Sequence, residues 1–389
     1  MTGRMRPGML VFAMLLAACE SSVTPAPPSG IAVSKTTFAE LPGWQAGNPE
    51  NALGAWRHSC GRLLAMDPST PLPGKVSAGT AGDWRDVCSA INALSGEPAE
   101  TRTFVESNFT PYTVSDGVTR DGLFTGYFEP IVRASAQADG EYNVPIHGLP
   151  RDHVTVHLKD FDPELAGRAL VGRLEGARLR PYPERAAISG ATGENTPVLY
   201  WADDALDVFI LQVQGSGIVE LPDGERRRIG FAGHNGHDYV SIGRSLIEQK
   251  ELRSGGAAWQ DIRTWMERNP ERFSELLALN RRYIFFRDNN GDGAQGAAGV
   301  VLTPEHSIAV DPKFLPLNVP LWLDTVHPGP GEERLQRLVL AQDVGNAIRG
   351  AVRGDFFWGV GPDALALAGR MKSPGTYYLL LPNNLTPSS

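Results

Sequence analysis

The stretch GLFTGYFEP, residues 122–130, separates two kinds of sequence. Before it, residues 45–110 carry apolar side chains at helical spacing. After it, short β-type runs follow one another between Gly, Pro and Asp clusters, at 142–146, 153–158, 207–221 and 226–233. Helical spacing returns at 240–252 and 257–279, and β-type runs resume at 283. This order predicts a mainly β fold with N-terminal helices, in which one domain interrupts another.

The composition is that of an ordinary globular protein whose charge does not suit nucleic acid. The 389 residues are 42% hydrophobic, and 43 Gly and 30 Pro favour turns and short strands over long helices. The formal net charge is −8. Because nucleic-acid binding depends on clustered Lys and Arg, we expect no nucleic acid as a partner.

The N-terminus is organised like a signal peptide. Arg4 and Arg6 precede an apolar run, Met9–Ala18, that is too short to span a membrane as a helix. We therefore expect residues 1–18 to be removed. Residues 16–19, LAAC, resemble a bacterial lipobox, which predicts a lipid on Cys19. A plain secretory signal with an incidental Cys is the alternative.

The residues after Cys19 indicate how the chain is anchored. Glu20 does not resemble an inner-membrane retention signal. We expect a lipoprotein on the periplasmic face of the outer membrane, whose only contact with the membrane is the lipid, with a soluble periplasmic protein as the alternative. Residues 20–30 lack an apolar period and are rich in Pro and Ser, which favours a flexible tether over residues 19–36.

Two further cysteines lie within helical patterns. Cys60 and Cys88 each fall on the apolar side of such a segment, in AWRHSCGRLLAMD and DWRDVCSAINAL. In an oxidising compartment the two can form a disulfide, and two inert buried thiols are the other interpretation.

Two patterns invite a metal assignment without supporting one. His234 and His237 lie three residues apart, but no H-E-x-x-H helix or Cys pair accompanies them. DNNGDG, residues 288–293, matches the first half of a calcium loop, yet Gly299 occupies the twelfth position, where a bidentate Glu is needed. We predict no metal and no cofactor.

Three aspartates lie at or just after β-type runs, where a barrel would present its loops to a groove. They are Asp311 in IAVDP, Asp343 in LAQDVG and Asp355 in RGDFFWG. Each alone could be a turn former. Asp355 differs because residues 356–358, Phe-Phe-Trp, follow it directly, either as an apolar wall that keeps a proton on the carboxyl group or as core anchors. Aromatic rings beside a carboxyl group also suit a sugar.

Six blocks resemble the signatures of the membrane-bound lytic murein transglycosylase A family. They occur in the expected order from about Thr125 to the C-terminus, and six agreeing blocks are more specific than any one. The blocks are LFTGYFEP, DVFILQVQGSG, GFAGHNGHDYVSIGRSLI, YIFFR, SIAVDPKFLPLNVPLWLD and AQDVGNAIRGAVRGDFFWGVG.

The resemblance implies a double-psi β-barrel catalytic domain formed by residues 37–130 and 289–389. A smaller β-barrel domain, residues 131–288, would be inserted into it, with the active groove between the two.

The resemblance also implies an activity, the cleavage of the β-1,4 bond between N-acetylmuramic acid and N-acetylglucosamine in peptidoglycan with formation of 1,6-anhydromuramyl ends. By similarity Asp355 is the catalytic acid/base, and Asp343 and Asp311 support it. The roles of Arg349 and Arg353 stay open, because each could contact the substrate or pair with one of the acids. Peptidoglycan strands are the expected partner, and a cell-wall remodelling complex is a further one. The residues expected to line the groove are Thr125, Gly126, Tyr127, Gln212, Gln214, Gly215 and Ser216.

A single Asp suffices for this reaction because the C6 hydroxyl of the substrate attacks C1, whereas ordinary glycosidases use two carboxylates. Asp355 would first protonate the glycosidic oxygen and then accept the proton of that hydroxyl. Two alternatives stay open. One is a murein hydrolase in which Asp343 or Asp311 activates water, and the other is a lipid-anchored peptidoglycan-binding protein with an inactive barrel.

Overall fold

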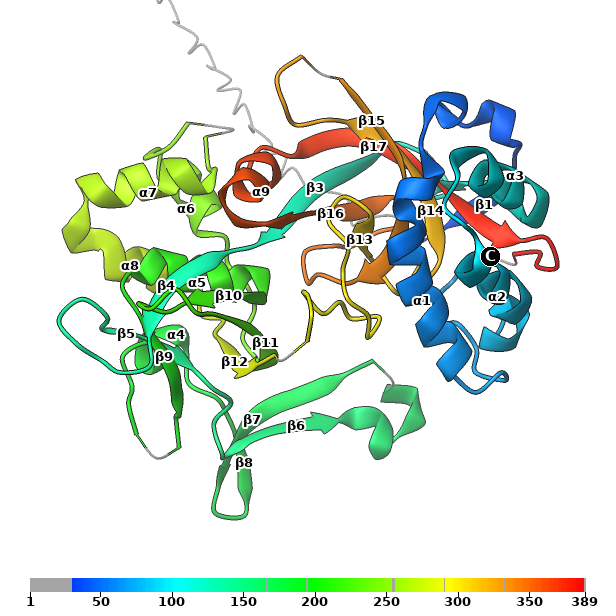
Figure 1. The fold of residues 1–389 in the computed structure, drawn as a ribbon. Helices are drawn as coiled ribbons and strands as arrows, with labels where there is room; N and C mark the ends of the chain where they lie inside the picture. Colours follow the sequence, from blue (N-terminus) through cyan, green and yellow to red (C-terminus); the bar gives the residue numbers. More distant parts are fainter. Residues whose placement is uncertain are drawn as a thin grey trace, which may run out of the picture.

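The computed structural model describes residues 30–165, 167–193, 195–253, 256–289, 291–331 and 333–387. The leader and Cys19 lie outside the described residues. N-terminal helices, a β-barrel and a second, smaller sheet follow one another across the molecule (Figure 1). None of the helices within the described residues is both long and apolar enough to cross a membrane.

Strands from both ends of the described chain form a closed six-stranded barrel. Neighbouring strands follow the order β17-β14-β15-β13-β16-β3, and β3 pairs with β17 to close the ring. The β13–β15 and β16–β3 pairs are parallel, whereas β14 runs antiparallel to both of its neighbours. The expected mainly β fold with a barrel and N-terminal helices is confirmed. The barrel strands are β3 (Gly122–Glu129), β13 (Ser307–Val310), β14 (Pro320–Val326), β15 (Arg334–Asp343), β16 (Arg353–Val360) and β17 (Lys372–Pro382).

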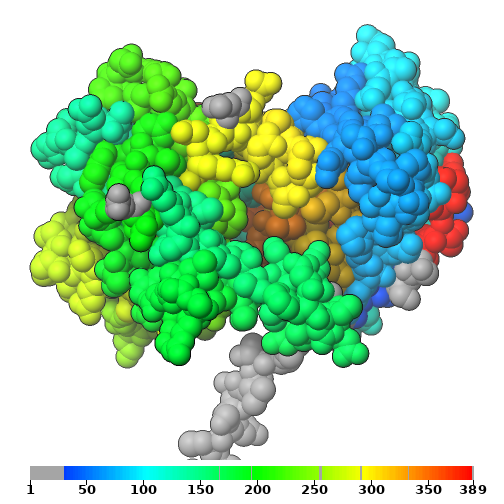
Figure 2. All heavy atoms as spheres, turned by 90° about the horizontal axis from the view of Figure 1, so that it is seen from below, coloured from blue at the N-terminus to red at the C-terminus, as the bar shows by residue number. Residues whose placement is uncertain are grey.

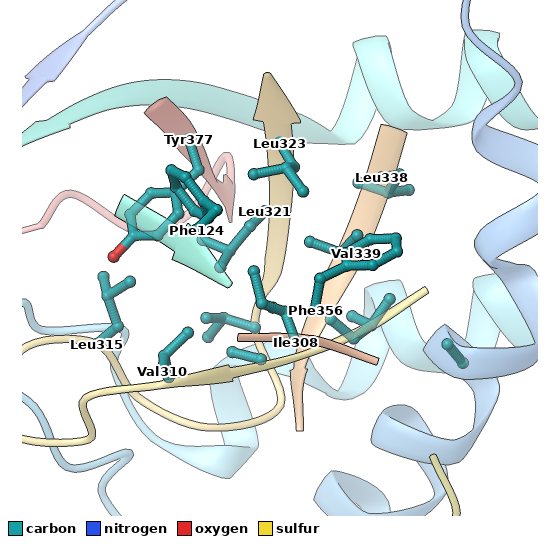
Figure 3. Close-up of a cluster of buried hydrophobic side chains, with 14 of the residues drawn as sticks. Phe124, Ile308, Val310, Leu315, Leu321, Leu323, Leu338, Val339, Phe356 and Tyr377 are labelled. Carbon is teal, nitrogen blue, oxygen red and sulfur yellow. The ribbon is translucent and has the colours of Figure 1, made fainter. Parts of the chain in front are cut away.

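Apolar side chains from every barrel strand fill its interior (Figure 3). Phe124 of β3 and Phe356 of β16 are both 0% exposed and point toward the same cluster as Ile308. Because successive side chains of a strand point to opposite faces, the neighbours Thr125 and Asp355 are turned away from the core. The packing of the barrel therefore decides on which face the polar residues of β3 and β16 lie.

Residues 19–36 were expected to form a flexible tether, but a strand lies at the C-terminal end of this range. Strand β1 (Ala32–Lys35) pairs antiparallel with β2 (Phe109–Ser115), which itself pairs with β17 outside the ring. The Pro-rich composition ends at residue 30, and an extended chain after it satisfies the free backbone groups at the edge of β2. The described part of the tether is thus ordered from Ala32 onward.

Helices α1 (Leu53–Ala65), α2 (Arg85–Ala93) and α3 (Pro98–Asn108) lie in the N-terminal segment where helical spacing predicted them. Cys60 and Cys88 are each 0% exposed, and a disulfide joins α1 to α2 through them. Short 3-10 helices complete this segment: η1 (Phe38–Glu40), η2 (Trp44–Ala46), η3 (Pro49–Ala52) and η4 (Ala81–Trp84).

A second sheet, which we call the insert sheet, is formed between β3 and β13 of the sequence. Its strand order is β12-β11-β10-β4-β9-β5, and a single bridge between Gly148 and Phe286 links its two edges. The domain boundaries at 130/131 and 288/289 stay a prediction. The strands are β4 (Ile131–Ser135), β5 (Val144–His147), β9 (Val198–Ala202), β10 (Ser216–Glu220), β11 (Arg226–His234) and β12 (Ile284–Asp288).

A three-stranded arm and several helices accompany the insert sheet (Figure 1). The arm consists of β6 (His153–His157), β7 (Ala169–Glu175) and β8 (Arg178–Pro181), with η5 (Leu158–Asp160) and η6 (Pro163–Leu165) at its tip. The helices are α4 (Arg185–Ile188), α5 (Ala205–Gln214), α6 (Ile242–Glu248), α7 (Trp259–Arg268), η7 (Pro270–Arg272) and α8 (Phe273–Ala278), and α9 (Gly361–Ala368) follows β16 in the barrel.

The expectation that residues 207–221 form one β-type run is wrong. Residues 205–214 form helix α5, and only 216–220 form a strand. The side chain of Asp204 accepts a hydrogen bond from the backbone N of Asp207 and caps the helix, and Gly215 ends it with a left-handed φ of 84°. The helix is apolar on most sides because it is buried between sheets, so its sequence resembles a buried strand.

Candidate functional site

The strand register places two of the three aspartates in one line across the outside of the barrel. Asp343 of β15 lies opposite Ala309 of β13, Ala309 lies opposite Asp355 of β16, and Asp355 lies opposite Thr125 of β3. A register shift between Ile308 and Ala309 brings Asp343 into this line. We call Asp343, Asp355 and Thr125 the acid row. One strand separates the two acids, so their Cα atoms are roughly 10 Å apart.

Asp355 is partly buried and held by a hydroxyl group. Thr125 Oγ1 donates a hydrogen bond of 2.6 Å to Asp355 Oδ1. Burial raises the pKa of Asp355 above its usual value of 3.8, while the Thr125 hydrogen bond and the charge of Arg353 act in the opposite direction. The carboxyl group can therefore hold a proton more readily than an exposed Asp and still be stabilised once it is ionised.

Arg353 lies beside the acid row. Its Nη2 donates to Thr125 Oγ1 over 2.8 Å, and its Nη1 donates to the carbonyl oxygens of Leu123, at 3.1 Å, and Gly354. Arg353 is thus a partner of Thr125 and, through its charge, of Asp355. Arg349 is exposed in the loop between β15 and β16, so the two arginines that the sequence left open occupy different settings.

The three aromatic residues after Asp355 do not form one wall. Phe356 and Trp358 belong to the main core, with ring centroids 4.8 Å apart. Phe357 alternates to the other face and packs on Tyr127, with ring centroids 5.1 Å apart. Two of the three are therefore core anchors, and only Phe357 lies on the same strand face as Asp355.

Asp343 is the second acid of the row and is held at both carboxylate oxygens. Tyr127 OH donates to its Oδ2 over 3.0 Å, and the backbone N of Ala297 donates to its Oδ1 over 2.9 Å. Burial raises the pKa of Asp343 to about 6, and the negative charge of Asp355 adds to the shift while the hydrogen bonds oppose it. Asp343 therefore lies in a fixed orientation close enough to Asp355 for the two charges to interact.

Gln342, directly before Asp343, is a supporting residue that the sequence reasoning missed. It is 0% exposed, its Nε2 donates to the carbonyl oxygen of Ala55 over 2.7 Å and to Ser59 Oγ over 2.9 Å, and its Oε1 accepts from Ser307 Oγ over 2.6 Å. These bonds join α1 to β15 and β13. An amide within the apolar run LVLAQD was the available signal, since a buried amide must be hydrogen-bonded.

Asp311 supports the loop beside the row instead of joining the row itself. It follows β13 directly, and its Oδ2 accepts from the backbone N of Gly350 over 2.9 Å, while its Oδ1 accepts from that of Lys313 over 3.1 Å. It is 3% exposed. The hydrogen bond from Gly350 fixes the loop that leads from Asp343 to Arg353, and the one from Lys313 fixes the turn that follows β13.

The expected groove residues separate into two groups. Thr125 and Tyr127 contact the two acids as described, whereas Gly126 between them faces the core, where a Cβ would come within 2.6 Å of Trp358 Nε1. Gly126 therefore has a packing reason to lack a side chain.

The second group lies where α5 meets β10. Gln214 Oε1 accepts from the backbone N of Phe128 over 3.2 Å, which ties the end of α5 to β3. Gly215 is the helix cap, and Ser216 begins β10. Gln212 is 4% exposed and lies beside Tyr283. Its burial differs from the expected position on an open groove, because the segment is a helix whose inner face it occupies.

The two histidines of GHNGHD turn to separate partners. His234 Nδ1 accepts from the backbone N of Gly236, and His237 Nε2 lies 2.8 Å from the carbonyl oxygen of Tyr182. Asp288, the first residue of DNNGDG, accepts a hydrogen bond of 2.8 Å from Tyr200 OH. No group of three or more His, Cys, Asp or Glu side chains suited to a metal ion occurs in the part of the chain that the structure describes.

The surface is hollowed between the barrel and the insert sheet. In Figure 2 the hollow lies between the blue N-terminal helices, the yellow segment that follows β12 and the green insert, and the orange late barrel strands are visible at its floor. The arm lies along its rim in this view. The late barrel strands are thus accessible from solvent through a concave surface.

Comparisons with known proteins find matches over most of the chain. Residues 123–287 match the family model described as the MltA specific insert domain, and residues 306–381 match the 3D domain. The chain is 32% identical over 309 residues to the membrane-bound lytic murein transglycosylase A of Escherichia coli K12, a match that covers 77% of this chain and 76% of that protein. It is 30% identical to the protein of the same name from Vibrio cholerae, over 78% of this chain and 77% of that one.

Solved structures share the fold over nearly the whole chain. MltA from Neisseria gonorrhoeae superposes with a TM-score of 0.80 at 33% identity, over 92% of this chain and 95% of the other. The membrane-bound lytic murein transglycosylase from Agrobacterium tumefaciens superposes with a TM-score of 0.80 at 29% identity, over 91% of this chain and 98% of the other. E. coli MltA with bound chitohexaose superposes with a TM-score of 0.67 at 25% identity, over 90% of this chain and 94% of the other.

Proposed function

The chain belongs to the membrane-bound lytic murein transglycosylase A family, and we propose that it cleaves the β-1,4 bond between N-acetylmuramic acid and N-acetylglucosamine in peptidoglycan, forming 1,6-anhydromuramyl ends. The observation that carries the proposal is the partly buried Asp355 of β16, which accepts a hydrogen bond from Thr125 of β3. Late barrel strands lie at the floor of a hollow between the barrel and the insert sheet. The chitohexaose complex of the E. coli relative supports a glycan as the ligand.

Asp355 acts as the only acid/base in this proposal. It begins protonated, a state that burial favours by raising its pKa, and it donates the proton to the glycosidic oxygen as the bond from C1 to that oxygen breaks. The resulting carboxylate then accepts the proton of the C6 hydroxyl of the muramic acid as its oxygen bonds to C1. No water is consumed, and Asp355 ends protonated as it began.

The neighbours of Asp355 serve the second half of the reaction. The hydroxyl of Thr125 and the charge of Arg353 both stabilise the carboxylate that remains after the first proton transfer. Because Arg353 donates to Thr125 Oγ1, the hydroxyl proton is directed toward Asp355. The attack by an internal hydroxyl has the advantage of proximity over attack by water.

Asp343 and Asp311 are supporting residues in this proposal. Asp343 holds Tyr127 and the chain at Ala297 in place, and Asp311 holds the loop at Gly350. Neither is assigned a proton transfer. We place the catalytic domain at residues 37–130 and 289–389 and the insert at 131–288, with the glycan between them. A lipid on Cys19, at the periplasmic face of the outer membrane, would keep the enzyme beside its substrate.

Digestion of purified peptidoglycan, with mass spectrometry of the products, tests the function. We expect anhydro ends from the native protein and a loss of about 10³-fold or more for Asp355→Asn. Asp363→Asn, at an exposed position on α9, is the matched control and should retain the native rate. Reducing ends would instead support the hydrolase, and binding without digestion by the native protein would support the peptidoglycan-binding protein.

A further inference from the structure

Strand β3 makes a third buried contact beyond the acid row. Its alternate residues share one face: Thr125 and Tyr127 reach the two acids of the row, and Glu129 reaches out of the barrel altogether. Glu129 Oε2 accepts a hydrogen bond of 3.1 Å from Arg228 Nε of β11, in the insert sheet. The strand that contacts both acids therefore also contacts β11, an inner strand of the insert sheet.

This ion pair is largely buried. The side chain of Glu129 is 2% exposed and that of Arg228 is 21% exposed. Burial raises the pKa of Glu129 against the influence of Arg228. A buried ion pair is weak evidence for stability, because well-packed apolar residues of the same volume serve at least as well. What the pair does supply is a directional contact between two sheets.

Arg228 also holds the chain where it leaves the insert sheet. Its carbonyl oxygen accepts a hydrogen bond of 2.8 Å from the backbone N of Asn289, directly after β12. The segment that begins there continues to Ala297, whose backbone N donates to Asp343. The entering strand at Glu129 and the leaving segment at Asn289 are thus both fixed to one residue, and both lead to hydrogen bonds on the same acid.

We propose that Arg228 is a positioning residue for the transglycosylase reaction: through its side-chain contact with Glu129, next to the main-chain bond to Asn289, it sets the insert sheet at a fixed distance and angle from the acid row, so that a glycan can contact both walls of the hollow at once. The inference rests on the proposed function for its catalytic consequence. Its structural part, the fixed placement of the two sheets, stands independently of the activity.

Kinetics on purified peptidoglycan test the catalytic consequence. Removing the ion pair by Arg228→Met should raise KM about tenfold, since one buried charge-assisted contact that orients the walls is lost, while kcat stays within about twofold because the row is intact. Glu129→Gln should have the same effect in a milder form, and Arg228→Lys should restore part of the affinity. Arg226→Met is the matched control, because Arg226 lies on the same strand in an exposed ion pair with Glu220.

Distances between spin labels test the structural part without substrate. Labels at Val118→Cys, 89% exposed before β3, and Gln137→Cys, exposed after β4, report on the barrel and the insert. Cys19→Ser in the same chain leaves only the introduced thiols to react, since Cys60 and Cys88 are bonded to each other. The distance distribution should be narrow in the parent and in Arg226→Met, and broader or shifted in Arg228→Met.

The two measurements separate the possible failures. An unchanged distance distribution in a folded Arg228→Met protein overturns the positioning role, whatever the activity. If the distance distribution broadens in Arg228→Met but the parent does not digest peptidoglycan, the role of Arg228 in placing the two sheets is supported and the proposed function is rejected. A fall in kcat alone, with KM and the distances unchanged, would also contradict the inference. If Arg228→Met does not fold, Glu129→Gln carries the same comparison.

Discussion

Thr125 and Asp355 lie 230 positions apart in the sequence, and the hydroxyl of the first is 2.6 Å from the carboxylate of the second. The parallel pairing of β3 with β16 puts them opposite each other, and the alternation of each strand turns both side chains away from the barrel core. The contact joins the first block of the sequence that resembled the family to the last. A substitution at Thr125 should therefore change the pKa of Asp355.

Thr125→Val should slow the reaction and change its pH dependence. The hydroxyl stabilises the carboxylate, so its loss raises the pKa of Asp355 further. Because the first step needs the protonated acid, the fall in kcat/KM at high pH should move to higher pH, and kcat should drop about tenfold. Thr125→Ser keeps a hydroxyl and should stay close to the parent. A pH–rate profile of the Val variant that overlies the parent's would remove Thr125 from the site.

Asp343→Asn should make stability less dependent on pH. Burial raises the pKa of Asp343 from 3.8 to about 6, so the folded state holds this proton more tightly than the unfolded chain. The stability gained from this group is present in full below pH 3.8 and is lost as the pH rises through about 6. The difference in the free energy of unfolding, variant minus parent, should therefore be larger at about pH 8 than at about pH 4, by on the order of 1–2 kcal/mol after screening. The difference in Tm should change in the same direction.

Thermal unfolding of both proteins at the two pH values measures this difference, and other titrating groups cancel in the subtraction. A difference that is constant with pH would place Asp343 in a more polar setting than the contacts indicate. Activity of the Asn variant should fall, since Tyr127 and Ala297 lose their charged acceptor.

Gly126→Ala should destabilise the fold. A Cβ at Gly126 would lie 2.6 Å from Trp358 Nε1 and 2.9 Å from Ala368 Cα, so the indole or α9 must shift. Such overpacking costs about 1–3 kcal/mol. Gly61→Ala, in helix α1 with nothing within 4 Å of the new Cβ, is the control and should be neutral or stabilising. Urea unfolding compares the two, and equal midpoints would mean that the barrel tolerates a side chain at 126.

Removing the disulfide should destabilise the N-terminal helices. The bond closes a loop over a sequence separation of 28 residues, which corresponds to about 3–4 kcal/mol of lost entropy in the unfolded chain. The double variant Cys60→Ser/Cys88→Ser, and the native protein after reduction, should both unfold at lower urea concentration. Native protein that unfolds at the same midpoint with and without reductant would favour two buried thiols.

Local patterns were enough to predict several parts of this molecule. Helical spacing around Cys60 and Cys88 predicted buried cysteines, and both are fully buried. The β-type runs predicted to resume at residue 283 include strand β13, Ser307–Val310. By contrast, the run beginning at Asp207 is a helix, because an apolar segment buried on most sides has no period that separates helix from strand.

The sequence by itself determined which residues are apolar, where strands and helices can begin and end, and that Asp355 adjoins aromatic residues. Only the tertiary structure decided which side chains meet. The shift at Ile308 and Ala309 brings Asp343 into line with Asp355, and Arg228 joins a strand and a segment that lie far from it in the chain. The reason is that strand register depends on the packing of the whole barrel, whereas periodicity records only the burial of each residue.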